Sequence, residues 1–307
     1  MTYTFLALAI VVGALPVAVH RQTGNSIEID AVFVDKGGKP VRDISRDEVE
    51  VWIAGYRVPL ASFIAVTPED PERSRRAIVL VLDDITLDPA LAPRIRAAGK
   101  AMVAAMREGD EMAIIALSGD ATKSTADVGV LMRTLDRYAP RASGFMRPDD
   151  LGAQVLRTIA AVSRQLMESG GRKRTIVGLG SGWLFDTPLP PAMSSGRELG
   201  PEWVDAMRAM SAANVTLYAI DPGGVGRTRF PGGDSGFARE TGGFAFLSTN
   251  DMKGAAAQIM EEASTYYILG INDPPMFRTA PLREVDVRVK RRGVTVRARR
   301  AIAGAGK

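Results

Sequence analysis

Two adjacent carboxylates, Asp83 and Asp84, directly follow five apolar residues in the segment IVLVLDDITLDP. A hydroxyl at Thr86 and a third carboxylate at Asp88 come just after them. Hard cations such as Mg²⁺ prefer oxygen ligands of these types. Two carboxylates this close repel each other unless a cation or a basic side chain lies beside them. Asp88 precedes a proline, which is the pattern of a helix N-cap, so the chemistry of the segment depends on Asp83, Asp84 and Thr86.

The side chains that most catalytic centres use are missing from the chain. It contains no cysteine, which excludes disulfides, thiol nucleophiles and thiolate metal sites. Its one histidine, His20, lies in the N-terminal segment that we expect to be removed. Without an imidazole, Ser-His-Asp catalysis and His-ligated zinc are excluded as well. The chemistry that remains would use carboxylates, Lys, Tyr or a cation held by oxygen atoms.

The N-terminal segment differs from the rest of the 307-residue chain. Residues 5–19, FLALAIVVGALPVAV, contain no charged side chain. This run is shorter than the roughly 20 apolar residues that span a bilayer, and Pro16 interrupts it as a helix. We interpret residues 1–20 as a secretory signal, although the usual basic start is missing and an uncleaved anchor stays open. The protein is therefore expected to be exported, to be periplasmic, at the cell surface or secreted.

The two carboxylates stand at the end of the first of several strands that alternate with helices. Most of these strands are continuous apolar runs, which is typical of strands buried on both faces of a parallel sheet. We predict strands at Ala77–Leu82, Met112–Leu117, Thr175–Leu179, Val215–Ile220, Phe244–Leu247 and Tyr266–Ile271. Apolar residues three or four positions apart predict helices at Pro89–Arg107, Asp149–Glu168, Pro201–Ala212 and Asp251–Ser264. The pattern indicates a doubly wound α/β domain with a mostly parallel sheet, which binds ligands at the carboxyl ends of its strands.

Both ends of the chain instead alternate between apolar and polar residues, as strands with one buried face do. In residues 26–66, the segment SIEIDAVFV places its Ile, Ala and Phe side chains on one face. In residues 278–302, the segment REVDVRVK does the same with valines, before an expected hairpin turn near Arg292. Neither segment has enough strands to be stable alone. We therefore predict that they pack together as one small antiparallel β unit.

The C-terminal segment is also the most basic part of the chain. Residues 278–307 carry ten Lys or Arg and two Asp or Glu, a net charge of +8. The whole chain carries +4, so the remaining residues sum to −4. A basic strand pair could attract anionic lipid, polysaccharide or nucleic acid, but we interpret it as a solvated strand face. Export makes nucleic acid an unsuitable partner, and we predict none.

Five segments occur in the order seen in von Willebrand factor type A domains. They are RAIVLVLDD, GDEMAIIALSGDA, KRTIVGLGSGW, NVTLYAIDPGG and ETGGFAFLSTNDMKGAAAQIMEEASTYYILGI. The chain more closely resembles bacterial exported VWFA-related proteins, in which a β segment precedes the A domain and a strand pair closes the chain. The resemblance covers nearly all of residues 26–302 and implies an A-type domain over residues 75–272.

The metal-ion-dependent adhesion site of this family uses Asp-x-Ser-x-Ser after the first strand, a later Thr and an Asp after the fourth strand. Asp83 matches the first Asp, but Ile85 and Leu87 stand where the serines belong. Thr125 matches the Thr, and Ser181 stands where the final Asp is expected. Alternatively, the carboxylates cap backbone N–H groups or pair with an arginine. The resemblance implies a degenerate site that could hold Mg²⁺ or another divalent cation through Asp83, Asp84, Thr86, Thr125 and Ser181.

The resemblance and the missing catalytic groups together favour a protein that is not an enzyme. We predict an exported binding or scaffold protein that holds a protein or glycan ligand at the carboxyl ends of its strands. The membrane would be a partner only if residues 1–20 remain as an anchor. Two alternatives stay open: a metal-dependent hydrolase that uses the two carboxylates, and a structural envelope protein that oligomerises through the β unit. The predicted binding rim includes Ser118, Asp120, Gly182 and Asp186.

Overall fold

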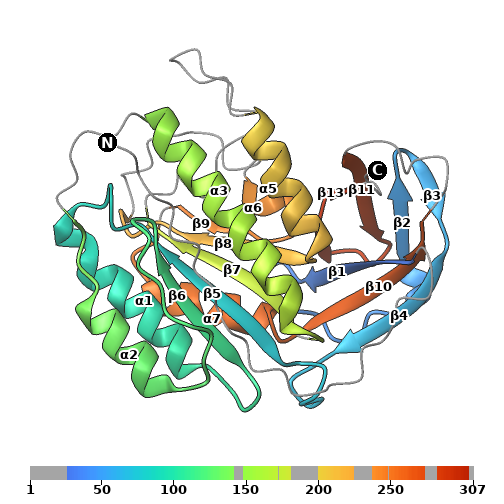
Figure 1. The fold of residues 1–307 in the computed structure, drawn as a ribbon. Helices are drawn as coiled ribbons and strands as arrows, with labels where there is room; N and C mark the ends of the chain where they lie inside the picture. The colour runs from blue at the N-terminus through green and yellow to red at the C-terminus, as the bar shows by residue number, and fades with distance from the viewer. Residues whose placement is uncertain are drawn as a thin grey trace.

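The computed structural model describes residues 26–141, 148–171, 173–180, 200–224, 237–247, 249–273 and 282–303. They form an α/β unit with a five-stranded parallel sheet and a β sandwich of two four-stranded antiparallel sheets (Figure 1). The predicted secretory signal lies outside the described residues. Within the described ranges, no helix has the length and apolar character needed to cross a membrane.

The parallel sheet has the strand order β6-β5-β7-β8-β9. Its strands are β5 (Arg76–Leu82), β6 (Glu111–Ala116), β7 (Lys173–Leu179), β8 (Val215–Ile220) and β9 (Ala245–Phe246). Every residue of β5 and of β8 is buried, as the continuous apolar runs predict. The chain continues from β5 to β6 on one side and returns to β7 on the other side. The winding direction therefore reverses at β5, which is where open α/β sheets bind ligands.

Helices cover both faces of this sheet, which confirms the doubly wound prediction (Figure 1). One face is covered by α1 (Ala92–Ala104), α2 (Val128–Arg137) and α7 (Met252–Glu262). The other face is covered by α3 (Pro148–Leu166), α5 (Gly200–Ala212) and the short α6 (Phe237–Glu240). Single 3-10 turns lie at Arg46–Glu48, Pro89–Leu91 and Met167–Ser169. Neighbouring strand residues such as Leu80 and Val81 pack into the two different layers, because side chains alternate along a strand.

The β sandwich consists of one sheet with the order β12-β1-β10-β4 and a second with the order β13-β11-β2-β3. The first contains β1 (Ser26–Val34), β4 (Leu60–Val66), β10 (Tyr266–Asn272) and β12 (Thr295–Ala298). The second contains β2 (Val49–Ile53), β3 (Tyr56–Val58), β11 (Leu282–Val289) and β13 (Ala301–Ala303). One apolar core joins the two sheets through side chains such as Phe33, Val51 and Val285. The predicted antiparallel unit of the two chain ends is confirmed.

The strand at residues 266–272 is not where the sequence predicts it. Its apolar run predicts a strand of the α/β domain, but β10 lies between β1 and β4 in the sandwich, with Tyr266 opposite Val66. Both faces of this strand are buried, because Tyr267 points into the sandwich core while Tyr266 belongs to a separate cluster with Val66. A strand buried on both faces has the same apolar pattern in either kind of sheet.

Two other elements also differ from the prediction. The C-terminal segment is not a hairpin, because β11 pairs with β2 and β13 whereas β12 pairs with β1. Alternation identifies the buried face of a strand but not its partner. Helix α2 has no counterpart among the predicted helices. Its start is fixed by Asp127, whose carboxylate accepts a hydrogen bond from the backbone N–H of Val130 at 3.0 Å.

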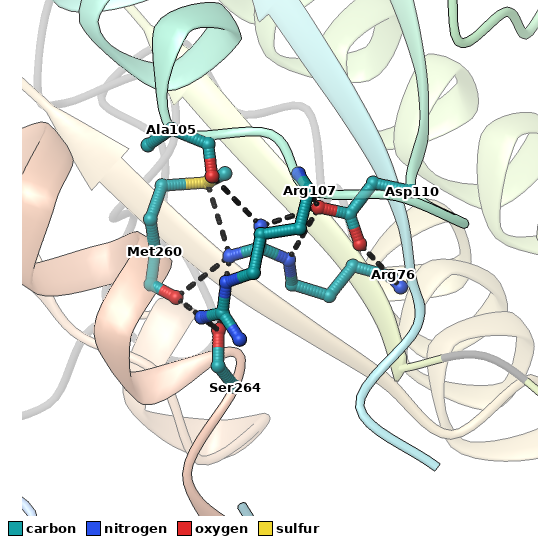
Figure 2. A network of polar contacts seen from close by, with 6 residues as sticks. All are labelled: Arg76, Ala105, Arg107, Asp110, Met260 and Ser264. Carbon is teal, nitrogen blue, oxygen red and sulfur yellow. Dashed lines mark hydrogen bonds and ion pairs between the residues drawn. The ribbon is translucent and has the colours of Figure 1, made fainter. Parts of the chain in front are cut away.

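A buried arginine lies at the amino end of β5, at the opposite end of that strand from the paired carboxylates (Figure 2). The guanidinium of Arg76 pairs with Asp110, whose carboxylate also accepts the backbone N–H of Arg76 at 3.0 Å. Both side chains are almost fully shielded from water. This arginine therefore connects β5 to the loop before β6 and to the ends of α1 and α7. Its other acceptors are the carbonyl oxygens of Ala105 (2.9 Å) and Met260 (2.8 Å) and the hydroxyl of Ser264 (3.0 Å).

A second buried cation joins the parallel sheet to the sandwich. The ammonium of Lys173, at the start of β7, lies 2.5 Å from the carboxylate of Asp30 in β1 and donates to Thr216 at 2.9 Å. Burial lowers the pKa of Lys173, and the charge of Asp30 acts against this shift. Asn214 donates to Asp30 at 3.0 Å and accepts from Arg299 of the C-terminal segment at 2.9 Å. We call this end of the sheet, with Arg76, the amino edge, and it rests on the sandwich.

Candidate functional site

The opposite end of the sheet, which we call the carboxyl edge, comprises the loops after β5 and β6 together with residues 138–141. Asp83 begins the first loop and is fully buried. One of its carboxylate oxygens accepts the backbone N–H groups of Ile85 at 3.2 Å and Thr86 at 2.9 Å. The other oxygen accepts the hydroxyl of Thr86 at 2.6 Å. The carboxylate of Asp83 therefore folds its own loop back onto the end of β5, as aspartates do in turns.

Asp84 points toward the loop after β6. Its carboxylate accepts the backbone N–H of Ser118 at 3.0 Å and the hydroxyl of Ser118 at 2.5 Å. The Nε atom of Arg141 lies 3.3 Å from the same carboxylate, and the backbone N–H of Arg141 donates to the carbonyl oxygen of Asp84 at 2.7 Å. Asp84 is buried, so its negative charge faces two neutral donors and one guanidinium instead of water. It connects three separate segments of the carboxyl edge.

Tyr138, directly after α2, binds the backbone of Asp83. Its hydroxyl donates to the backbone carbonyl oxygen of Asp83 at 2.6 Å. Burial raises the pKa of Tyr138, and the charges of Asp83 and Asp84 raise it further. The phenol therefore stays protonated and keeps donating at neutral pH. Arg96 of α1 holds the same segment from the other side by donating to the carbonyl oxygen of Tyr138 at 2.9 Å.

The structure describes two of the four residues of the predicted rim. Ser118 and Asp120, two of the predicted rim residues, are exposed and follow β6. Asp120 also pairs with the guanidinium of Arg141, which brings it beside Asp84. The predicted rim residues Gly182 and Asp186 and the predicted ligand Ser181 lie outside the described residues.

Thr125 does not lie beside the other predicted ligands. After β6 the chain turns back, so that Ala121 pairs with Ile115 and Thr125 pairs with Met112, near the start of that strand. This places Thr125 four residues before the end of β6, roughly 13 Å from the carboxyl edge at the rise of a strand. Its hydroxyl accepts the backbone N–H of Asp127 at 3.0 Å and so prepares the start of α2. The return of the chain explains why this threonine cannot join Asp83.

The described donors do not fit Mg²⁺ or a similar cation. Such a cation needs about six oxygen ligands in an open, nearly octahedral arrangement. Asp83 and Asp84 are buried and accept hydrogen bonds from loop groups, and Asp84 already has a cation beside it. In the part of the chain that the structure describes, no three His, Cys, Asp or Glu side chains come together in a group able to hold a metal. The contacts instead match the alternative in which carboxylates cap N–H groups and pair with an arginine.

Two functional groups of this edge could not be found by motif reasoning. Arg141 and Tyr138 follow a helix that was not predicted, and nothing in their local sequence points to Asp83 or Asp84, more than fifty residues away. One signal was present, because two adjacent carboxylates at a strand end call for a basic partner. That requirement predicts the kind of side chain but not its position.

A second polar group stabilises the described part of the same edge near β8. Arg94 of α1 donates to the carbonyl oxygen of Pro222 at 2.8 Å and to the side chain of Asn250 at 3.3 Å. The carboxylate of Asp221, the first residue after β8, accepts the backbone N–H of Gly223 at 2.7 Å, which makes the turn expected for Asp before Pro. Asp221 is therefore engaged in the turn as well.

No family model matches the chain, and no curated protein matches it. Solved structures to which the chain is similar include an aerotolerance-related membrane protein from Bacteroides fragilis, with 17% identity and a TM-score of 0.41, covering 61% of this chain and 98% of that one. A pilus adhesin from Lactobacillus rhamnosus has 8% identity and a TM-score of 0.41, covering 75% of this chain and 36% of that one. A von Willebrand factor type A protein from Catenulispora acidiphila has 8% identity and a TM-score of 0.41, covering 93% of this chain and 75% of that one.

The von Willebrand factor type A family, which the sequence segments resemble, is thus also represented among the structural neighbours. These neighbours have identities of 17% or less and share only part of their geometry with the chain.

Proposed function

We propose that the protein is an exported, non-enzymatic binding or scaffold protein that holds a protein or glycan at the carboxyl edge. The observation that supports this most is the use of the two carboxylates. Asp83 and Asp84 hold the loops after β5 and β6 in place, while Thr86, Ser118 and Asp120 on those loops face solvent. A surface of exposed polar groups on fixed loops is suited to recognition, because little conformational entropy is lost on binding.

The same contacts argue against the hydrolase alternative. A catalytic carboxylate must reach a substrate or a water molecule at hydrogen-bond distance. Asp83 and Asp84 are 0% and 2% exposed, and both carboxylates bind groups of the loops. Tyr138, which contacts Asp83, has a raised pKa and donates to a backbone carbonyl oxygen. Asp83, Asp84 and Tyr138 therefore support the surface loops from below and do not react with a substrate.

Export of the protein rests on the apolar, uncharged residues 5–19, which have the composition of a signal core. N-terminal sequencing of the protein secreted by a bacterial host tests this part. A mature start near residue 20 is expected. Retention of the whole chain in the cytoplasm would contradict export without affecting the proposal for the carboxyl edge.

Binding at the carboxyl edge can be tested with two charge-reversal variants. The variant Asp120→Lys changes the exposed rim, whereas Glu72→Lys makes the same change at an exposed position in the linker before β5. Both proteins and the wild type are applied to a glycan array and to an array of purified extracellular proteins, and affinities for the positive spots are measured by surface plasmon resonance. We expect Asp120→Lys to weaken binding at least about tenfold, which corresponds to one lost charged contact, and Glu72→Lys to leave it unchanged.

Two results would contradict the proposal. If Asp120→Lys and Glu72→Lys bind equally well, the ligand is held elsewhere on the molecule. If the wild type hydrolyses a phosphoester or a glycoside and Asp84→Asn does not, the protein is an enzyme and Asp84 reacts in spite of its burial.

A further inference from the structure

We propose that Arg141 is the resident cation of the carboxyl edge, so that this edge keeps its shape without a divalent metal ion. The residues at this position resemble a metal site with its serines replaced, and the described donors do not fit Mg²⁺. The guanidinium of Arg141 instead lies 3.3 Å from the buried carboxylate of Asp84 and also pairs with Asp120. This assignment concerns how the edge is held together, and it stands whether or not the edge binds a partner.

The charge of the two carboxylates requires such a cation. Asp83 and Asp84 are adjacent in the chain and are both buried, and burial of an ionised carboxylate is costly unless it is paired. Asp83 is satisfied by donors of its own loop. Asp84 has the two donors of Ser118 and, beyond them, only one positive charge among its described contacts, that of Arg141.

The position of Arg141 is fixed by more than its side chain. Its backbone N–H donates to the carbonyl oxygen of Asp84 at 2.7 Å. Three residues earlier, the hydroxyl of Tyr138 donates to the carbonyl oxygen of Asp83 at 2.6 Å. Each backbone carbonyl of the carboxylate pair is therefore bound by the same short segment. The backbone of residues 138–141 is therefore held against Asp83 and Asp84, and this positions the guanidinium of Arg141 beside the carboxylate of Asp84.

Exposure of the arginine does not make this an ordinary surface ion pair. The Arg141 side chain is 55% exposed, and exposed pairs contribute little to stability. The Arg141 pair differs from ordinary surface ion pairs in its carboxylate, because the side chain of Asp84 is only 3% exposed. The pair of Arg164 and Asp205 provides the comparison, with exposures of 54% and 48%. The two arginines are equally exposed, but only Arg141 faces a buried carboxylate, so Arg164→Gln reports the loss of an exposed pair.

The test uses the variants Arg141→Gln and Arg164→Gln in the full mature chain. Thermal midpoints are measured in EDTA and with millimolar Mg²⁺, Mn²⁺ or Ca²⁺. We expect the wild type and Arg164→Gln to melt within about 1 °C of each other and to be unaffected by metal. Arg141→Gln is expected to melt about 4–8 °C lower, because Asp84 then lacks its cation. A divalent cation should recover part of this loss in Arg141→Gln alone, since it would replace the missing positive charge.

The double variant Arg141→Gln/Asp84→Asn completes the design. It removes both charges, so its midpoint in EDTA should lie above that of Arg141→Gln and should not respond to metal. A rise of the wild-type midpoint with metal would overturn the proposal, as would equal midpoints for Arg141→Gln and Arg164→Gln. If Arg141→Gln does not fold, the double variant decides the question, because its failure to fold without metal would show that the charge of Asp84 is not what Arg141 neutralises.

Discussion

The two ends of the parallel sheet each contain an arginine paired with a buried aspartate, but the two pairs lie in different surroundings. Figure 2 shows Arg76 paired with Asp110 at the amino edge. Their side chains are 1% and 2% exposed. At the carboxyl edge, the side chain of Arg141 is 55% exposed while that of Asp84 is 3% exposed. The amino pair lies between β5, α1 and α7, whereas the carboxyl pair lies between loops.

The two arginine–aspartate pairs therefore have different structural roles. The acceptors of Arg76 lie on elements that are far apart in the sequence, so the amino pair fixes the packing of helices against the sheet. Among the described residues, Asp84 binds loops of its own edge, so the carboxyl pair fixes the shape of a surface. We therefore expect changes at the amino edge to unfold the protein and changes at the carboxyl edge to alter one surface.

The largest effect is expected from removing the buried cation of the amino edge. Arg76→Ala leaves the carboxylate of Asp110 buried without its guanidinium and also frees the carbonyl oxygens of Ala105 and Met260. Breaking one partner of a buried pair costs about 3–5 kcal/mol of unfolding free energy. Urea unfolding followed by circular dichroism measures this loss. Arg164→Ala, at an exposed pair, serves as the control, and a loss for Arg76→Ala no larger than that of the control would remove the distinction between the two edges.

A smaller effect is expected from Asp83→Ala at the carboxyl edge. The carboxylate of Asp83 accepts three hydrogen bonds, but its donors on Ile85 and Thr86 are only partly buried and can bind water instead. We expect a loss of about 2 kcal/mol in unfolding free energy. The matched control in the same loop is Asp88→Ala, which removes an exposed cap and should cost about 1 kcal/mol. A cost for Asp83→Ala above that of Arg76→Ala would reverse the comparison.

The pH dependence of stability offers a third test, at the amino side of the sheet. Glu262, at the end of α7, is fully buried beside Arg297 of the sandwich, and burial raises its pKa from 4.5 to about 7. Between these two values the folded protein binds more protons than the unfolded chain. The contribution of Glu262 to the unfolding free energy therefore decreases as pH rises through this window and is constant above about pH 7.

Glu262→Gln should remove this dependence. We expect the difference in unfolding free energy between about pH 5 and pH 7.5 to shrink by about 1–2 kcal/mol in the variant, because the neutral amide does not titrate. Urea midpoints at the two pH values measure it. Glu261→Gln, one position earlier in the same helix, is the control, because the side chain of Glu261 is exposed whereas that of Glu262 is buried. An unchanged pH dependence in Glu262→Gln would mean that Arg297 keeps this carboxyl group ionised throughout.

The smallest effect is expected from an ion pair that lies on neither edge. Lys100 of α1 and Asp136 of α2 form a pair with exposures of 39% and 60%. Lys100→Gln should change the unfolding free energy by less than about 0.5 kcal/mol, and the small change should vanish in high salt. Urea titrations with and without added sodium chloride measure this. A cost above about 1 kcal/mol would show that exposure is a poor guide to the strength of ion pairs in this protein.

Much of the fold is predictable from local patterns, because burial on two faces and burial on one face leave different periodicities. The continuous runs at Arg76–Leu82 and Val215–Ile220 and the alternation in Ser26–Val34 are all strands in the structure. Partner choice is not predictable in this way. Strand β10 is buried on both faces in an antiparallel sheet, and β11 and β12 pair with different strands. These pairings depend on contacts between distant segments, which a local pattern does not contain.

The candidate site, like the fold, is predictable from the sequence only in part. The position of Asp83 and Asp84 at a strand end and the cap at Asp88 follow from the sequence. The prediction for Thr125 fails because the chain reverses after β6, which spacing alone does not show. Arg141 reaches Asp84 because α2 packs on α1 and returns the chain to the edge, so its contact depends on tertiary packing.

The α/β unit is inserted between two strands that are direct neighbours. The chain leaves the sandwich at the end of β4 and returns at the start of β10, where Val66 and Tyr266 are paired. Tension applied between Ser26 and Ala303 can therefore pass from β4 to β10 through their shared ladder, bypassing the inserted unit. Under such a load, the inserted α/β unit, with its carboxyl edge, lies outside the direct path of the force.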